Sequence, residues 1–291
     1  MQHSKARKPQ KKKTRPAAIA ETLHAIPGQP IHRRAREKTM KTEKLSDTIT
    51  IINADCRDVL NEIVADYIVS DPPYGISYDA SHSKYQNGKD HGIVEWDKEP
   101  YDPTPILKMK LPSIVWGGNC FASKLPDCPG WLCWVKINRN GTKIRQAEME
   151  LAWSNSVTRS QCYRYTWIGA GMEGETNRVN GGTCHPTQKP VPLMAWCMDT
   201  IAVPQCSIVL DPYMGSGTTG IACIRTGRRF IGIEIDEQHY QTARRRLMGE
   251  LAQTNLFRKD EDARAGQGEC PGPACNSASP KAAQVTMELG L

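Results

Sequence analysis

The sequence predicts an α/β fold with a doubly wound, mostly parallel sheet, and two stretches carry this prediction. Residues 48–71 read as a strand ("TITIINAD"), a short helix ("CRDVLNEI") and a second strand ("DYIVSD"). Residues 207–236 read as a strand, a glycine turn, a helix and a strand that ends in acids. Apolar strands that alternate with helices are typical of a parallel sheet covered on both faces.

The intervening residues supply further elements. We expect strands at 111–119, 130–136 and 147–155, a helix at the end of 185–201 and another at 237–251. Residues 76–104 and 155–184 are polar and irregular. Irregular stretches of this length are usually functional or disordered.

The two ends of the chain differ in composition from its middle. Residues 1–48 hold thirteen Lys and Arg against four Asp and Glu, a net charge of +9, whereas the whole chain carries +7. We therefore expect a basic, disordered tail at 1–47, one domain at 48–251 and a Gly- and Pro-rich disordered tail at 252–291. The basic tail is either a contact for nucleic-acid phosphates or a solvated leader.

Cysteine usage and hydropathy exclude several classes of protein. The eleven cysteines include no C-x-x-C pair, so we expect free thiols and no metal site. No secretory signal and no apolar run long enough for a membrane span are present. The expected protein is soluble, intracellular and cytoplasmic.

The first chemical motif is "SDPPYG" at residues 70–75. Pro72 and Pro73 cannot continue a central strand, so the strand must end there. Asp71 and Tyr74 should then project from the carboxyl edge of the sheet.

The second motif is a glycine turn of the nucleotide-binding type. Gly215, Gly217 and Gly220 fit G-x-G-x-x-G, and Glu234 ends the next strand, where an acid can hold ribose hydroxyls. An NAD-dependent dehydrogenase would use such a turn. However, Asp211 precedes the glycines, where a cation suits better than a phosphate, and a dehydrogenase leaves "DPPY" unexplained. An adenosine with a cationic side chain, S-adenosylmethionine, fits both observations.

Together, "DPPY" (71–74), "HPTQKP" (185–190) and "DPYMGSGTT" (211–219) resemble the amino-methylating DNA methyltransferases. The catalytic tetrapeptide precedes the glycine loop, an order similar to that of the permuted β group of that family. The resemblance covers roughly residues 48–250. It implies a Rossmann-like fold that binds S-adenosylmethionine and acts on double-stranded DNA.

The resemblance also implies roles at the catalytic end. Asp71 and the Pro72 carbonyl would accept hydrogen bonds from an exocyclic base amine, Pro73 would stiffen the turn, and Tyr74 would stack on the base. The base must be flipped out of the duplex to reach them. Asp at the head of the tetrapeptide favours adenine N6 over cytosine N4, and argues against glutamine methylation of protein.

At the cofactor end, the resemblance assigns residues to each part of S-adenosylmethionine. The methionine part would lie among Asp211, Gly215, Gly217 and Thr218; Glu234 would hold the ribose, Asp55 the adenine edge, and Lys189 would help to position the cofactor. Asp55 and Asp211 have a purely structural alternative, as helix caps.

Some alternatives remain open from the sequence. Only about thirty residues, 155–184, are available for target recognition, fewer than the family usually has. A cytosine-N4 methyltransferase and a catalytically inactive DNA-binding accessory of the same fold are both compatible with the motifs. The sequence also leaves open a homodimer and an endonuclease partner.

Overall fold

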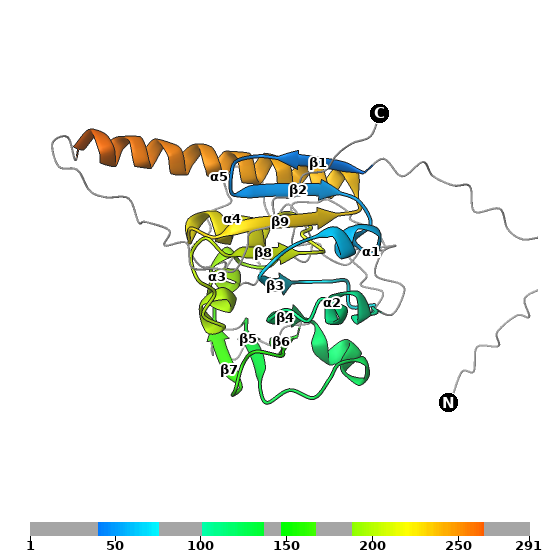
Figure 1. Ribbon diagram of the computed structural model, residues 1–291. Helices are drawn as coiled ribbons and strands as arrows, with labels where there is room; N and C mark the ends of the chain where they lie inside the picture. The colour runs from blue at the N-terminus through cyan, green and yellow to red at the C-terminus, as the bar shows by residue number, and fades with distance from the viewer. Residues whose placement is uncertain (1–39, 76–100, 137–146, 167–187, 265–291) are drawn as a thin grey trace, which may run out of the picture. The chain divides into compact units, whose positions relative to one another are not determined.

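A computed structural model describes residues 40–75, 101–136, 147–166 and 188–264, with side chains to residue 254. These residues form a nine-stranded sheet with the order β1-β2-β9-β8-β3-β4-β6-β5-β7 (Figure 1). The strands are β1 (Lys41–Lys44), β2 (Ile49–Asn53), β3 (Tyr67–Ser70), β4 (Ser113–Trp116), β5 (Trp131–Val135), β6 (Met149–Ser154), β7 (Gln161–Arg164), β8 (Ile208–Asp211) and β9 (Arg229–Glu234).

The central run from β2 through β9, β8 and β3 to β4 is parallel. At one edge β1 pairs antiparallel with β2. Toward the other edge β6 is antiparallel to both β4 and β5, and β7 is parallel to β5. The predicted mostly parallel α/β sheet is confirmed.

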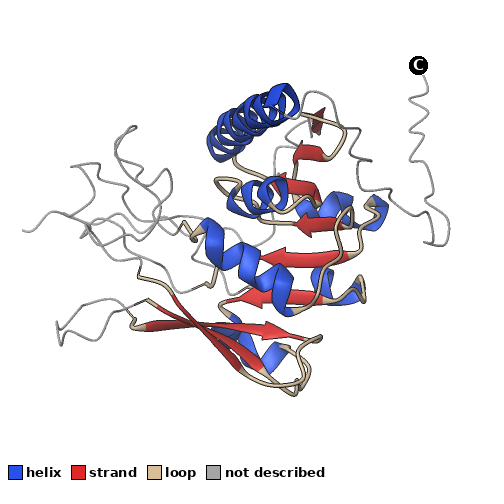
Figure 2. Ribbon diagram, turned by 90° about the vertical axis from the view of Figure 1, so that its left-hand side faces the viewer, coloured by secondary structure: helices blue, strands red, loops and turns tan. Residues whose placement is uncertain are grey.

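Helices lie on both faces of the sheet (Figure 2). They are α1 (Cys56–Val59), α2 (Thr104–Lys108), α3 (Val191–Thr200), α4 (Thr218–Arg225) and α5 (Glu237–Arg264), with 3₁₀ turns η1 (Leu60–Glu62) and η4 (Gly118–Lys124). Among the described helices, none is both long enough and apolar enough to cross a bilayer.

Two apolar cores result, because successive strand residues point to opposite faces. Val69 and Val209 pack with α3, α4 and α5, whereas Ile68 and Leu210 pack with α1, α2 and η4. All four of these side chains are fully buried. This two-sided burial explains why β3 and β8 carry consecutive apolar residues at their centres instead of an alternation of apolar and polar ones.

Both expected domain boundaries differ from the structure. β1 lies inside the segment expected to be a tail; its sequence "KTEK" has no apolar signal, because it is an edge strand held by main-chain pairing with β2. Helix α5 runs to Arg264, beyond residue 251, because "AQTNLFRKDEDAR" contains no Gly or Pro and the Gly- and Pro-rich composition begins only at Gly266. Residues 1–39 and 265–291 lie outside the described residues.

The irregular stretches also contain elements that we did not predict. α2 begins at Thr104, at the end of the 76–104 stretch, and β7 lies within 155–184, the expected target-recognition insert. Residues 76–100 and 167–187, which include most of both stretches and the "HPT" of "HPTQKP", lie outside the described residues.

Candidate active site

The two motifs meet at the carboxyl edge of the sheet, where β3 and β8 are parallel neighbours. The strand that follows β3 in this parallel run, β4, lies on one side of the pair, and the strand that follows β8, β9, lies on the other side. Such a switch point is where α/β sheets bind their ligands. The Ser70 hydroxyl donates a hydrogen bond of 2.7 Å to Asp211 Oδ1, which joins the two motifs directly.

The tetrapeptide lies as its prolines predict. β3 ends at Ser70, and residues 71–74 leave the sheet without regular structure. The Tyr74 hydroxyl donates to Asp71 Oδ1 at 2.7 Å. The carboxylate and the phenol therefore form one polar cluster at the strand end.

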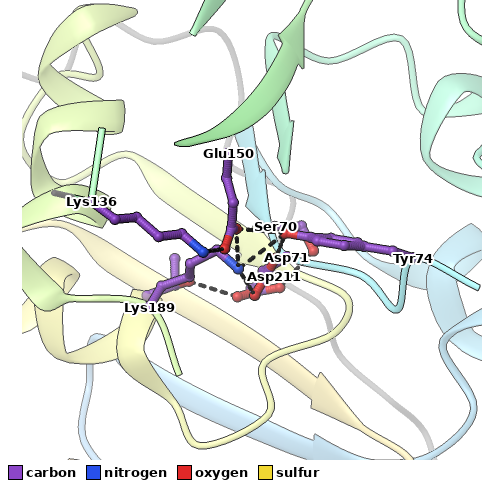
Figure 3. Close-up of polar contacts among 8 residues, drawn as sticks. Ser70, Asp71, Tyr74, Lys136, Glu150, Lys189 and Asp211 are labelled. Carbon is purple, nitrogen blue, oxygen red and sulfur yellow. Dashed lines mark hydrogen bonds and ion pairs between the residues drawn. The ribbon is translucent and has the colours of Figure 1, made fainter. Parts of the chain in front are cut away.

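Lys189 belongs to this cluster (Figure 3). Its Nζ donates to Asp71 Oδ2 at 2.6 Å and to the Tyr74 oxygen at 3.0 Å, and it lies 5.3 Å from the centre of the Tyr74 ring. The side chain is only 4% exposed. The resemblance implied a place for Lys189 at the cofactor end; the structure places its ammonium against Asp71 and Tyr74 of the tetrapeptide.

Glu150 on β6 completes the cluster, and we did not predict it. Glu150 Oε2 lies 3.1 Å from Lys189 Nζ and 3.1 Å from the Tyr74 hydroxyl. Glu150 Oε1 forms an ion pair with Lys136, which follows β5. An acid directly before the apolar residues "LAW" (151–153) was the available signal, but a single sequence does not reveal what that acid faces.

The charges in this cluster stabilise one another. Burial alone would raise the pKa of Glu150, but the ammonium groups of Lys189 and Lys136 outweigh it and lower that pKa to about 2. Burial alone would lower the pKa of Lys189, yet the carboxylates of Asp71 and Glu150 raise it. Burial raises the pKa of Asp71 despite its ion pair with Lys189.

Asp211 is fixed by three donors. Besides Ser70, the Thr219 hydroxyl donates to Asp211 Oδ2 at 2.6 Å and the Tyr213 N–H to Oδ1 at 3.1 Å. Burial raises the pKa of Asp211 to about 6. Gly217, not Asp211, is the N-cap of α4, so the alternative of Asp211 as a helix cap is wrong.

The glycine loop follows Asp211. Gly215 and Gly217 have φ values of +51° and +81°, a left-handed conformation that favours glycine. Thr218, the first residue of α4, is buried. Glu234, at the end of β9, accepts the Gly215 N–H at 2.9 Å, and burial raises its pKa to about 7.

Asp55 is the N-cap of α1, so the structural alternative inferred for it from the sequence, a helix cap, is confirmed. Its carboxylate accepts the Arg57 N–H at 3.0 Å and also contacts the Arg57 guanidinium. Asp55 follows β2, whose last residue Asn53 is paired with Glu234. The structure therefore places Asp55 and Glu234 at the ends of neighbouring strands, and the role of Asp55 toward adenine stays a prediction.

Comparison with known proteins gives a family match over the second half of this site. Residues 134–245 match the family model of the N6/N4 type described as "DNA methylase". The match includes Glu150, Lys189, Asp211 and Glu234, but not the tetrapeptide at 71–74.

Two curated relatives match shorter segments. YubD of Escherichia coli (strain K12), described as a methylase, is 41% identical over 70 residues, which is 24% of this chain and 30% of YubD. The type II methyltransferase M2.DpnII of Streptococcus pneumoniae is 44% identical over 103 residues, 35% of this chain and 32% of the relative. The match thus spans about a third of the length of each relative.

Solved structures show a more distant likeness. The M1.HpyAVI–SAM complex has a TM-score of 0.40 and 25% identity, covering 68% of this chain and all of the other. The cytosine-N4-specific PvuII DNA methyltransferase has a TM-score of 0.46 and 13% identity, covering 68% of this chain and 86% of the other. By sequence, residues 134–245 match the N6/N4 DNA methylase family, which confirms the resemblance inferred from the motifs.

Proposed function

We propose that this protein transfers a methyl group from S-adenosylmethionine to the exocyclic N6 amine of an adenine in DNA. The observation that carries the proposal is the hydrogen bond between Ser70 and Asp211, because it brings the catalytic tetrapeptide and the glycine loop to one edge of the sheet. The family of residues 134–245 supports methyl transfer to DNA.

The glycine loop fits S-adenosylmethionine. A Cβ placed on Gly215 would meet no atom of the described residues within 4 Å, so among these residues nothing covers the outer side of the loop. Gly215, Gly217, Thr218 and Asp211 would hold the methionine part, and the Glu234 carboxylate would accept the ribose hydroxyls. When bound, this cofactor supplies an electrophilic methyl group on a sulfonium.

The residues of the tetrapeptide would prepare the amine. Its lone pair is delocalised into the base, and hydrogen bonds to the Asp71 carboxylate and the Pro72 carbonyl favour a pyramidal nitrogen. The Tyr74 ring would stack on the flipped base, worth about 1–3 kcal/mol. Transfer then depends mainly on positioning, and no covalent enzyme intermediate is required.

Double-stranded DNA is the proposed substrate, and adenine the proposed base because Asp71 heads the tetrapeptide. The description of the S. pneumoniae relative as a type II methyltransferase supports a role in restriction and modification. A homodimer and an endonuclease partner are further proposals that follow from that role.

The test is incubation of the purified full chain with methyl-labelled S-adenosylmethionine and unmethylated genomic DNA, followed by nucleoside chromatography. We expect label in N6-methyladenine. Label in N4-methylcytosine would keep the mechanism and change the base. No label in DNA, with the cofactor still bound, would instead support an inactive DNA-binding accessory.

The matched control is Asp71→Ala, which removes both carboxylate oxygens that would accept the amine. It should abolish transfer while cofactor affinity stays within a few-fold. Loss of cofactor binding would show that Asp71 does not have the role proposed for it.

A further inference from the structure

Both oxygens of the Asp71 carboxylate already accept a hydrogen bond from within the protein. Tyr74 donates to Oδ1, and the Lys189 ammonium donates to Oδ2 at 2.6 Å (Figure 3). An ammonium and a base amine are both N–H donors, and the charged donor binds a carboxylate more strongly. A base amine must therefore compete with Lys189 for Asp71.

Lys189 cannot simply move into water, because its side chain is 4% exposed. A buried ammonium without a counter-charge is strongly unfavourable. The second carboxylate within reach is Glu150, 3.1 Å away. Lys136 shares Glu150, so two ammonium groups and two carboxylates balance in charge.

We propose that Glu150 is a positioning residue that receives the Lys189 ammonium when a base amine takes its place on Asp71. Glu150 acts through Lys189 and does not touch the base. This inference rests on the proposed function, since it concerns access of the target amine to Asp71. Lys189 then blocks the Asp71 carboxylate reversibly, because its ammonium occupies Asp71 until a base amine takes its place.

Glu150→Gln tests the proposal, because the amide keeps the size of the side chain and removes its charge. Without that charge the ammonium pairs with Asp71 alone, so kcat/KM for DNA should fall roughly tenfold or more at neutral pH. Cofactor affinity should not change. The matched control is Glu148→Gln, an exposed glutamate two residues earlier in the chain, which should behave as wild type.

A pH profile separates this role from a structural one. Removing a neighbouring carboxylate lowers the pKa of Lys189, so in Glu150→Gln a rise in pH should neutralise Lys189, release Asp71 and restore activity. Wild type should show no such recovery. Among the described residues, the titratable groups that face Lys189 are Asp71, Tyr74, Glu150 and, from α3, Cys197.

A double-mutant cycle tests whether Glu150 acts through Lys189. In a Lys189→Gln background the added Glu150→Gln change should cost less than about twofold. An equal loss in both backgrounds, or a Glu150→Gln rate equal to that of Glu148→Gln, would overturn the proposal. NMR titration of ¹³Cε-labelled lysine, independent of methyl transfer, should show a lower Lys189 pKa in Glu150→Gln.

If Glu150→Gln does not fold, Lys136→Gln gives a test of opposite sign. In this variant Glu150 is no longer shared with Lys136, so it should attract the Lys189 ammonium more strongly and kcat/KM for DNA should rise. A fall in kcat/KM would contradict the proposal. If wild type methylates no DNA, the proposed function itself fails. If wild type methylates DNA and Glu150→Gln matches its control, only the present inference fails.

Discussion

The Gly117 backbone lies directly against the Tyr74 ring: a Cβ at Gly117 would come within 2.1 Å of Tyr74 Cε1. Gly117 follows β4 and has a φ of +72°, a conformation that other residues adopt only with strain. Glycine is thus required twice, for the turn and for the space that the ring occupies. The end of β4 thereby determines where the Tyr74 phenol can lie.

Gly117→Ala should displace Tyr74 from Asp71 and reduce methyl transfer at least about tenfold, with a loss of stability of about 1–3 kcal/mol from the strained backbone. Initial rates and urea unfolding measure the two effects. The control is Gly249→Ala on α5, where a Cβ meets no atom of the described part of the chain within 4 Å; this variant should keep the rate and gain up to about 1 kcal/mol of stability. A wild-type rate in Gly117→Ala would contradict the argument.

Arg246 on α5 holds the glycine loop through hydrogen bonds to Ser216. Its Nη1 donates to the Ser216 carbonyl and, at 2.8 Å, to the Ser216 hydroxyl. Arg246→Gln should loosen the loop and weaken S-adenosylmethionine binding roughly tenfold, since a charged hydrogen bond contributes about 1.5–3 kcal/mol. Calorimetric titration measures this. The exposed neighbour Arg245→Gln should bind normally, and equal affinity in both variants would exclude the role.

Glu234 should make stability fall with rising pH. Its pKa is raised from 4.5 to about 7 by burial, so the folded state binds the proton more tightly than the unfolded state. The contribution is fully present below pH 4.5 and is lost as pH rises through about 7, roughly 3 kcal/mol in all. Urea unfolding from pH 4.5 to 8 measures it.

Glu234→Gln should flatten this dependence and leave the smaller part due to Asp211, whose pKa is raised to about 6. The exposed Glu237→Gln is the control and should keep the wild-type slope. An unchanged slope in Glu234→Gln would mean that this carboxyl does not carry the proton.

The sequence predicted the parts of the site that depend on local signals. The prolines after Ser70 end β3, and the glycines after Asp211 form the turn before α4, because both effects act within a few residues. The cluster around Lys189 was not predictable in the same way. Glu150 reaches it because β6 inserts between β4 and β5, and strand order depends on long-range pairing that one sequence does not show.

The ends of the fold were missed for a related reason. β1 pairs through its main chain, and its Glu43 carboxylate pairs with Arg244 on α5, so nothing apolar marks the strand. The tail expected at 252–291 was inferred from the average Gly and Pro content of that whole segment, and this average concealed the helical residues 252–264. Elements without a buried face leave little pattern in a sequence.

The position of β1 also decides how the basic segment should be tested. Residues 1–39 hold eleven Lys and Arg against two acids, and their deletion leaves β1 intact. If this segment binds phosphates, the deletion should weaken DNA binding and flatten its salt dependence by about 0.9 in log–log slope for each phosphate that is no longer neutralised. Unchanged binding would make this segment a solvated leader.

Deleting residues 1–44 tests the structural role of β1 separately from DNA binding. This deletion also removes β1 and the Glu43–Arg244 ion pair, so it should lower the midpoint of unfolding, whereas deletion of 1–39 should not.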